Sequence, residues 1–410
     1  MDSYKSVFSE RWCRKSPLLH LFSREKKVAL SRQLCNWLVE SESGLGEAPT
    51  MERIESFFET SCFVQDNADL MTQREALDYL IKRLAICLKH LAKFANDTAD
   101  HPTVGRISLQ KASLVTIGKR AVLWADGLLN AFKKLRQVRA ELRFRGVMDA
   151  IAMQDPLVGL FNITDLERAE QFDAAFAQKA GFGDKLFTGC NGTDFNLAFA
   201  LASLASAASK FAFDLRILQS DGEMSVSFGD EQVGSSAVSA LENHGMINQM
   251  VSMLLNCAAV GYVGSTDGIG TGTQYTMQQR AFLDADAILS TLLAVIPKLC
   301  VNYGVVNDNV AKSYAFLERA KMMLTRSFGN NQQKAHAFIN DIFRGNVQNR
   351  EEVLAKFPED VRADLAQLIA NPILLCGRSV EIVRDFLDNE LQEAISGVTE
   401  EEMQPEELDV

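Results

Sequence analysis

Residues 201–220 read LASLASAASKFAFDLRILQS, and this stretch is unusually rich in small side chains. Small side chains let neighbouring helices approach closely and lose little rotamer freedom on burial. No proline occurs between Pro156 and Pro297, so no residue in this part of the chain fixes φ or removes a backbone donor. We therefore expect Asn196–Ser220 to form one helix buried in a bundle of helices.

Four further segments show apolar residues at helical spacing. The first, Ala68–Ala95, has an apolar stripe made of Leu70, Leu77, Leu80, Leu84, Leu88 and Leu91. The others are Ser113–Arg145, Ala240–Val263 and Met277–Asn302, and smaller helices are expected after Tyr303. Helices of this length predict an all-α protein, an elongated long-helix bundle flanked by smaller helical domains.

The pattern also divides the chain into four parts. Residues 1–58 predict an N-terminal helical domain, residues 59–303 the central long-helix bundle, and residues 304–397 a C-terminal helical domain. Residues 398–410 contain six acidic side chains and predict a disordered acidic tail.

Composition argues against several classes of function. The formal net charge is −11 and no dense Lys/Arg block occurs, so a nucleic-acid partner is not expected. The eight cysteines form no C-x-x-C pair and the five histidines lie far apart, so we expect no disulfide framework, no metal site and no cofactor. The apolar stretch Met246–Val263 contains Asn248 and Gln249, which favours a core helix over a membrane span. These features predict a cytoplasmic protein.

Several strings spread along the chain occur in a recognisable order. They include YKSVFSERW (4–12), TSCFVQDNADL (60–70), ADHPTVGRISLQKASLVTIGKR (99–120), KKLRQVRAELRFRGV (133–147), EQVGSSA (231–237) and AFLDADAILSTL (281–292). In this order they resemble the animal-type adenylosuccinate lyase family, within the fumarase and argininosuccinate lyase superfamily. The resemblance covers most of residues 1–400. It implies the superfamily's long-helix bundle and a tetramer in which each active site draws loops from three subunits.

The family's reaction is a β-elimination in which a base removes a proton beside a carboxylate and an acid protonates the departing nitrogen as fumarate leaves. The acid is the His of a T-H-x-Q-P motif, because imidazole titrates near neutral pH. In this chain the resemblance puts Ser108 at that position, and a hydroxyl is far too weak an acid. Gln110 is retained, Lys111 replaces the proline, and His101 lies on the wrong side of the turn at Gly105.

The family's base is the first Ser of S-S-x-M-P-x-K-x-N, whose Lys stabilises charge on the substrate carboxylate. The corresponding string here is SSAVSALEN (235–243), so Ser235 and Asn243 are retained. Leu241 stands in place of the Lys, and Glu242 beside it would repel both an alkoxide and a dicarboxylate substrate. Ser235 is therefore a vestigial base position, and Ser235 with Ser236 is better explained as the cap of a following helix.

The resemblance also implies positions that bind the nucleotide. Arg11 and Trp12 stand where the family places an Arg and an aromatic residue, and Thr60 and Ser61 match its Thr-Ser substrate loop. In contrast, the family's T-G-Q-T-Y-x-R reads TGCNGTDF (188–195). The phosphate-binding segment with its Arg pair becomes the glycine-rich GSTDGIGTGTQYTM (264–277), which contains no basic residue.

These losses support three hypotheses. The first is a catalytically inactive paralogue that forms homotetramers, or mixes with the active lyase and modulates it. The second is a divergent lyase that still releases fumarate, with Ser235 as base and Lys111, Lys119 or Arg120 replacing the lost cation. The third is a structural role in a larger assembly, with the acidic tail or the altered loops as a docking surface.

Overall fold

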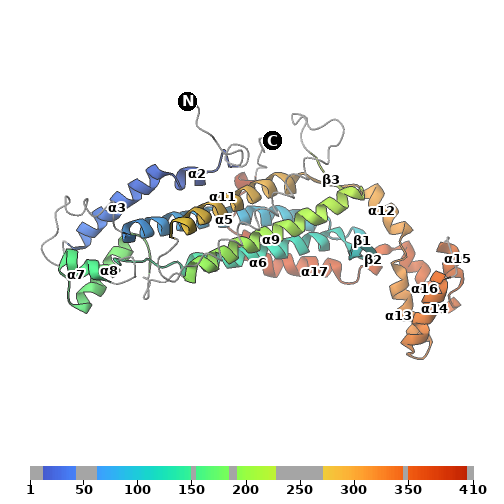
Figure 1. Cartoon of the computed structure of the whole chain (residues 1–410). Helices are drawn as coiled ribbons and strands as arrows, with labels where there is room; N and C mark the ends of the chain where they lie inside the picture. Colours follow the sequence, from blue (N-terminus) through green and yellow to red (C-terminus); the bar gives the residue numbers. More distant parts are fainter. Residues whose placement is uncertain are drawn as a thin grey trace.

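The computed structural model describes residues 13–42, 62–148, 154–183, 192–227, 271–344 and 350–403. It is an elongated bundle of long helices with smaller helical groups at both ends (Figure 1). Within these described residues, four long helices form the bundle: α5 (Cys62–Asp97), α6 (Ile117–Glu141), α9 (Gly192–Ser220) and α11 (Thr271–Val295). The predicted all-α class is confirmed. The helix expected at Ala240–Val263 lies outside the described residues.

The bundle interior follows from the helical spacing of the apolar residues in α5. Leu77, Leu80, Leu84, Leu88 and Leu91 each have 0% of their surface exposed. They therefore form the continuous buried stripe that the sequence predicts, and the helix itself extends beyond the predicted ends to Cys62 and Asp97. At about 1.5 Å per residue, such a helix is on the order of 50 Å long.

Small residues set the distance between the long helices. A Cβ built on Gly118, in the first turn of α6, would lie 2.4 Å from the carbonyl oxygen of Ala95 in α5. Farther along α6, a Cβ on Gly127 would lie 3.4 Å from the Cβ of Ala207 in α9. The small residues that drew attention in the sequence therefore serve close helix packing.

A β-hairpin separates α5 from α6, and the sequence interpretation missed it. Strands β1 (Pro102–Ile107) and β2 (Gln110–Thr116) pair antiparallel, so the helix predicted from Ser113 begins only at Ile117. The Thr116 side chain caps that helix by accepting a hydrogen bond from the Lys119 backbone N–H at 3.1 Å. Apolar residues at helical spacing continue backward into β2, and this continuation made the prediction wrong.

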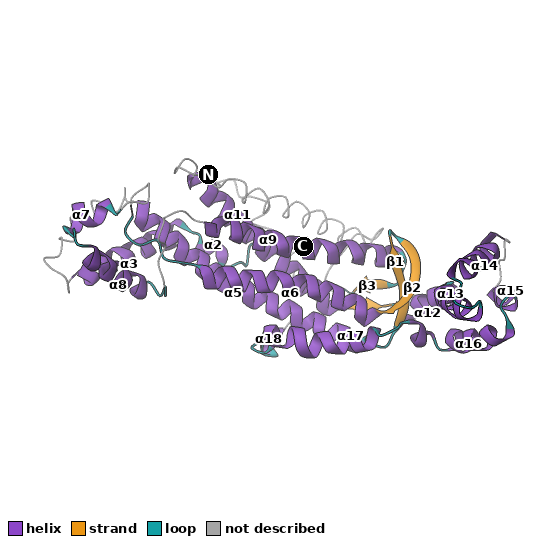
Figure 2. Cartoon of the chain, turned by 90° about the horizontal axis from the view of Figure 1, so that it is seen from below, coloured by secondary structure: helices purple, strands orange, loops and turns teal. Residues whose placement is uncertain are grey.

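A second small sheet closes the same end of the bundle. Strand β3 (Met224–Val226), after α9, pairs antiparallel with β4 (Leu299–Val301). The helix predicted for Met277–Asn302 ends at Val295, because Pro297 follows in a short 3₁₀ helix, η1 (Ile296–Lys298). Both small sheets therefore lie where long helices end, as Figure 2 shows for β1, β2 and β3.

The outer helical groups extend the molecule in both directions. At one end α3 (Arg24–Glu42), preceded by the short α2 (Leu18–Leu21), lies near α7 (Asp155–Phe161) and packs against α8 (Leu166–Lys179). At the other end α12 (Tyr303–Lys312) leads to a group with a separate apolar core. This group contains α13 (Phe316–Ser327), α14 (Gln332–Arg344), α15 (Arg350–Ala355), α16 (Glu359–Ala370) and η2 (Pro372–Leu375).

The C-terminal part of the described chain returns to the bundle. Helix α17 (Ser379–Asp385) continues through a π-helical segment, η3 (Phe386–Leu391), into α18 (Gln392–Ile395). A last 3₁₀ turn, η4 (Glu401–Met403), follows. Val398 and Met403 pack against the main core. The predicted disorder is therefore wrong for residues 398–403, where packing and lysine contacts order an acidic segment.

Helix α9 combines length with high hydropathy. Within the described part of the chain, Asn196–Ser220 is the one segment long and apolar enough to span a membrane by length and composition alone. Half of its most apolar window is buried inside the protein, as in a core helix of a helical bundle.

Candidate functional site

The position that the resemblance assigns to the acid lies at the tip of the β1–β2 hairpin (Figure 2). Ile107 pairs with Gln110, so Ser108 and Leu109 form a two-residue turn. Both have positive φ, 49° and 67°, as a type I′ turn requires. Ser108 and Gln110 are exposed, and the flanking Ile107 and Leu109 are 71% and 64% exposed. The turn is therefore exposed on the surface of the described part of the chain.

A buried carboxylate fixes the base of the hairpin to the bundle. Glu223, between α9 and β3, is fully buried and accepts hydrogen bonds on Oε1 from Arg106 Nη2 at 2.8 Å and Asn309 Nδ2 at 3.0 Å. Its Oε2 lies 3.4 Å from Thr103 Oγ1 and 3.6 Å from Arg120 Nη1. Buried charges are tolerated when they are paired and hydrogen-bonded, as they are here. The residues of this network come from β1, α6, α12 and the turn between α9 and β3.

The two arginines of this network respond differently to their surroundings. Burial lowers the pKa of Arg106, but hydrogen bonds and charge interactions with Glu223 and Asp221 outweigh it, so the net pKa is raised. Burial dominates for Arg120 and lowers its pKa, although the charge of Glu223 acts in the opposite direction. Arg120 also donates to the carbonyl oxygen of Val104 at 2.9 Å. Both guanidinium groups therefore hold the hairpin in place.

Lys111, Lys119 and Arg120, which the sequence suggests as replacements for the lost loop lysine, interact with other residues of the chain. Lys111 Nζ donates to Asn309 Oδ1 at 2.8 Å, and Arg120 is held by Glu223 and Val104. Lys119 is half-buried, and burial lowers its pKa while Asp126 opposes the shift. Two of the three cations thus stabilise the hairpin and its junction with α12.

His101 begins the connection into the hairpin but takes part in a different contact. Its Nδ1 lies 3.1 Å from Asp100 Oδ1, and its ring centroid is 4.8 Å from that of Tyr303. The interaction with Tyr303 ties the imidazole to the start of α12. Among the sequence-predicted positions, the structure describes Ser108 and Gln110, whereas Arg11, Trp12, Thr60, Ser61, Ser235 and Asn243 lie outside the described residues.

Sequence reasoning missed Glu223 as a residue that organises this region. Gly222, in the left-handed region at φ 70°, gives the usual signal for the end of a helix. The sequence does not indicate that Glu223 pairs with Arg106, because Arg106 lies 117 positions away along the chain.

A second candidate surface runs along α6 and α9 and consists of Leu123, Phe199, Ser206 and Phe213. Phe199, Ser206 and Phe213 are spaced seven residues apart, so they share one face of α9. Leu123, Phe199 and Phe213 are 54%, 53% and 49% exposed. We call this surface the α6–α9 face. Large apolar side chains exposed along one side of a helix are a feature of protein–protein interfaces.

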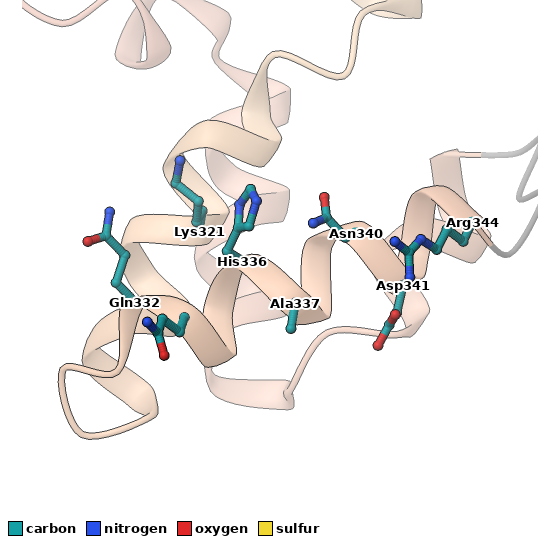
Figure 3. Close-up of a pocket in the computed structure, with 8 residues that line it drawn as sticks. Lys321, Gln332, His336, Ala337, Asn340, Asp341 and Arg344 are labelled. Carbon is teal, nitrogen blue, oxygen red and sulfur yellow. The ribbon is translucent and has the colours of Figure 1, made fainter.

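The C-terminal group also carries an open depression of about 490 Å³ between α13 and α14. Lys321, Gln332, His336, Asn340 and Arg344 line it, and their side chains spread over an open surface (Figure 3). All of these side chains are at least partly exposed, so no buried polar group directs a ligand into it. In the described part of the chain, no cluster of three or more His, Cys, Asp and Glu side chains could hold a metal ion.

Comparison with known proteins accounts for this architecture. The family model described as Lyase matches residues 57–240. The chain is 33% identical to an adenylosuccinate lyase of Caenorhabditis briggsae, in an alignment that covers 100% of this chain and 99% of the relative. The chain belongs to the adenylosuccinate lyase family. The alignment runs over 476 positions, more than the 410 residues of this chain, so parts of the relative have no counterpart here.

Solved structures support the fold of this adenylosuccinate lyase family member. A 3-carboxy-cis,cis-muconate lactonizing enzyme from Pseudomonas putida has a TM-score of 0.75 at 16% identity, covering 95% of this chain and all of the other. A fumarate lyase from Mesorhizobium sp. BNC1 has a TM-score of 0.74 at 18% identity with the same coverage. At these identities the likeness concerns the fold, the long-helix bundle of the fumarate lyase superfamily.

Proposed function

We propose that this adenylosuccinate lyase-like protein no longer performs the lyase reaction and has a structural or regulatory role as an oligomer, with itself or with the active lyase. The observation that carries the proposal is the hairpin turn. Ser108 occupies the acid's position, and the nearby Lys111 and Arg120 are bonded to Asn309 and Glu223.

The chemistry of β-elimination explains why these features matter. The departing nitrogen needs a proton donor that titrates near neutral pH, and the substrate carboxylate needs a cation as negative charge builds up on it. A serine hydroxyl does not supply the first. Arg120 would have to leave a buried carboxylate to supply the second, and that carboxylate would then remain buried without full compensation.

The α6–α9 face supports assembly into an oligomer. Phe199 and Phe213 lie on one edge of the bundle with about half of their surface exposed, although the same helices bury apolar residues completely on their other faces. A second bundle packed on this face would remove that surface from water. We infer a homotetramer or a mixed oligomer with the active lyase. We place this oligomer in the cytoplasm, in the context of purine nucleotide biosynthesis.

The alternative is a divergent lyase that still releases fumarate. It is favoured by Ser235 and Asn243, which are retained at family positions. The purified chain should be incubated with adenylosuccinate while fumarate release is followed, with an active adenylosuccinate lyase as positive control. We expect no release above the uncatalysed background. Turnover by the purified chain would establish the alternative.

Assembly is tested separately by introducing a charge into the α6–α9 face. Phe213→Glu should convert the oligomer into smaller species in sedimentation velocity. Leu166→Glu is the matched control, because Leu166 is a 70% exposed apolar residue on α8, outside this face. An unchanged sedimentation coefficient for Phe213→Glu would remove the face from the proposal. Co-purification with tagged active lyase then distinguishes a mixed oligomer from a homo-oligomer.

A further inference from the structure

The last described residues form a strap across α5, which we define as residues 398–403. Lys89 Nζ donates to the carbonyl oxygen of Val398 at 2.7 Å, and Lys82 forms an ion pair with Glu402. Met403, at the other end of the strap, packs against the main apolar core. Contacts from one face of a single helix thus hold both ends of the strap.

Thr399 is the second residue of the strap, and its side chain is exposed. Its backbone N–H donates to Glu402 Oε2 at 3.0 Å, so Glu402 binds both Lys82 and the threonine's own backbone. The hydrogen bond to Lys82 is the main cause that lowers the pKa of Glu402 to about 2, and the bond to Thr399 adds to it. An exposed hydroxyl therefore lies next to a row of three glutamates.

We propose that Thr399 is a phosphorylation site for a protein kinase that selects acidic residues after its acceptor. The acceptor is followed directly by Glu400, Glu401 and Glu402. A kinase with a basic substrate groove recognises such a row by charge complementarity. The γ-phosphoryl group of ATP is transferred to Thr399 Oγ1, the hydroxyl proton passes to the kinase's base, and ADP leaves.

The fold distinguishes Thr399 from other hydroxyls with a similar sequence context. Among the described residues, Thr164 and Ser220 also have acidic residues at the first and third following positions. After Ser220, however, Glu223 is fully buried and Asp221 is bonded to Arg106. After Thr164, Asp165 caps α8 by accepting from the Arg168 backbone N–H at 3.0 Å. Of these three described sites, only the carboxylates after Thr399 belong neither to an α-helix nor to a buried network, since Glu401 and Glu402 lie in the single 3₁₀ turn η4.

Phosphorylation of Thr399 would also release the strap. A phosphate adds about two negative charges near neutral pH. It would lie beside the Glu402 carboxylate, which now accepts from the Thr399 backbone, so the two anions repel each other. The contact between Glu402 and Lys82 is the one that this repulsion disrupts first. The modification therefore weakens the attachment of the strap to α5.

The test uses the full-length protein, Mg-ATP and a purified acid-directed serine/threonine kinase, with intact mass and peptide mass spectrometry as readouts. We expect one phosphoryl group on the peptide that contains Thr399, complete loss in Thr399→Ala, and retention in Thr399→Ser. Ser220→Ala is the matched control and should leave incorporation unchanged. A synthetic peptide of residues 394–404 confirms that the kinase accepts the sequence.

Two results would overturn the assignment. One is modification of the peptide but not of the folded protein, and the other is incorporation that persists in Thr399→Ala. Release of the strap is measured by hydrogen exchange of the backbone amides in residues 398–403, which should become faster in the phosphorylated protein. Unchanged or slower exchange at these amides would overturn the release mechanism.

Discussion

Packing constrains the choice of amino acid strongly in the interior of the bundle and weakly at the tip of the hairpin at its end. Along α5 the leucine stripe is completely buried, and Gly118 lies so close to Ala95 that a methyl group has no room. At the hairpin tip Ile107 and Leu109 are largely exposed, and two residues other than glycine adopt positive φ. Packing therefore determines residue identity in the bundle. At the tip, packing within the chain imposes no such requirement on Ser108, although the base of the hairpin is fixed by Glu223.

The largest effect is expected from breaking the link between these two regions. Glu223→Ala removes the carboxylate that faces Arg106 and Arg120, leaving two partly buried guanidinium groups without their shared partner. Removing one partner of a buried ion pair costs about 3–5 kcal/mol. We expect the free energy of unfolding in urea to fall by that order. Exposed Glu390→Ala, which disrupts only the surface pair with Lys133, is the control and should change it by less than about 1 kcal/mol.

A smaller loss of folding stability is expected from a substitution inside the bundle. In Gly118→Ala the new methyl group would meet the Ala95 carbonyl oxygen at 2.4 Å and Ala99 Cα at 2.7 Å, both backbone atoms. Overpacking of this kind costs about 1–3 kcal/mol, seen as a lower Tm. Gly159→Ala, where a methyl group meets nothing within 4 Å, is the matched control. Equal effects for the two variants would contradict the claim that close packing sets the identity of Gly118.

Much of the bundle could be predicted from the sequence because its signals are local and periodic. The stripe in α5 and the small residues of α9 each identify a helix by themselves, and only the exact ends differ. The hairpin could not be predicted, because its two-residue turn contains neither glycine nor asparagine, the usual residues at positive φ. The Glu223 network depends on contacts between distant segments. At the candidate site the resemblance predicts that Ser108 stands at the acid's position, but the sequence does not show that Arg120 pairs with Glu223.

The buried His90 side chain is expected to make the folding stability of the protein depend on pH. His90 is 8% exposed, and burial, followed by the charge of Lys93, lowers its pKa below the ordinary value. The unfolded chain then binds a proton near pH 6.5 that the folded chain does not, so folding stability falls as pH decreases below about 6.5. Urea unfolding of wild type and His90→Phe at neutral and mildly acidic pH measures this. The variant should lose less stability on acidification, and equal losses would rule out His90 as the source.

The smallest effect on folding stability is expected at the hairpin tip. Whether a substitution there raises or lowers stability tests most directly that packing constrains the tip less than the bundle. Leu109 has φ 67°, a region where a residue with a side chain is strained by about 1–2 kcal/mol. Leu109→Gly removes that strain but increases the freedom of the unfolded chain by about 0.5–1 kcal/mol, so a net gain of roughly 0.5 kcal/mol is expected. Differential scanning calorimetry should show a slightly higher Tm with the oligomeric state unchanged. A marked decrease would mean that the exposed leucine makes a contact in the oligomer, and the tip would then be as constrained by packing as the bundle.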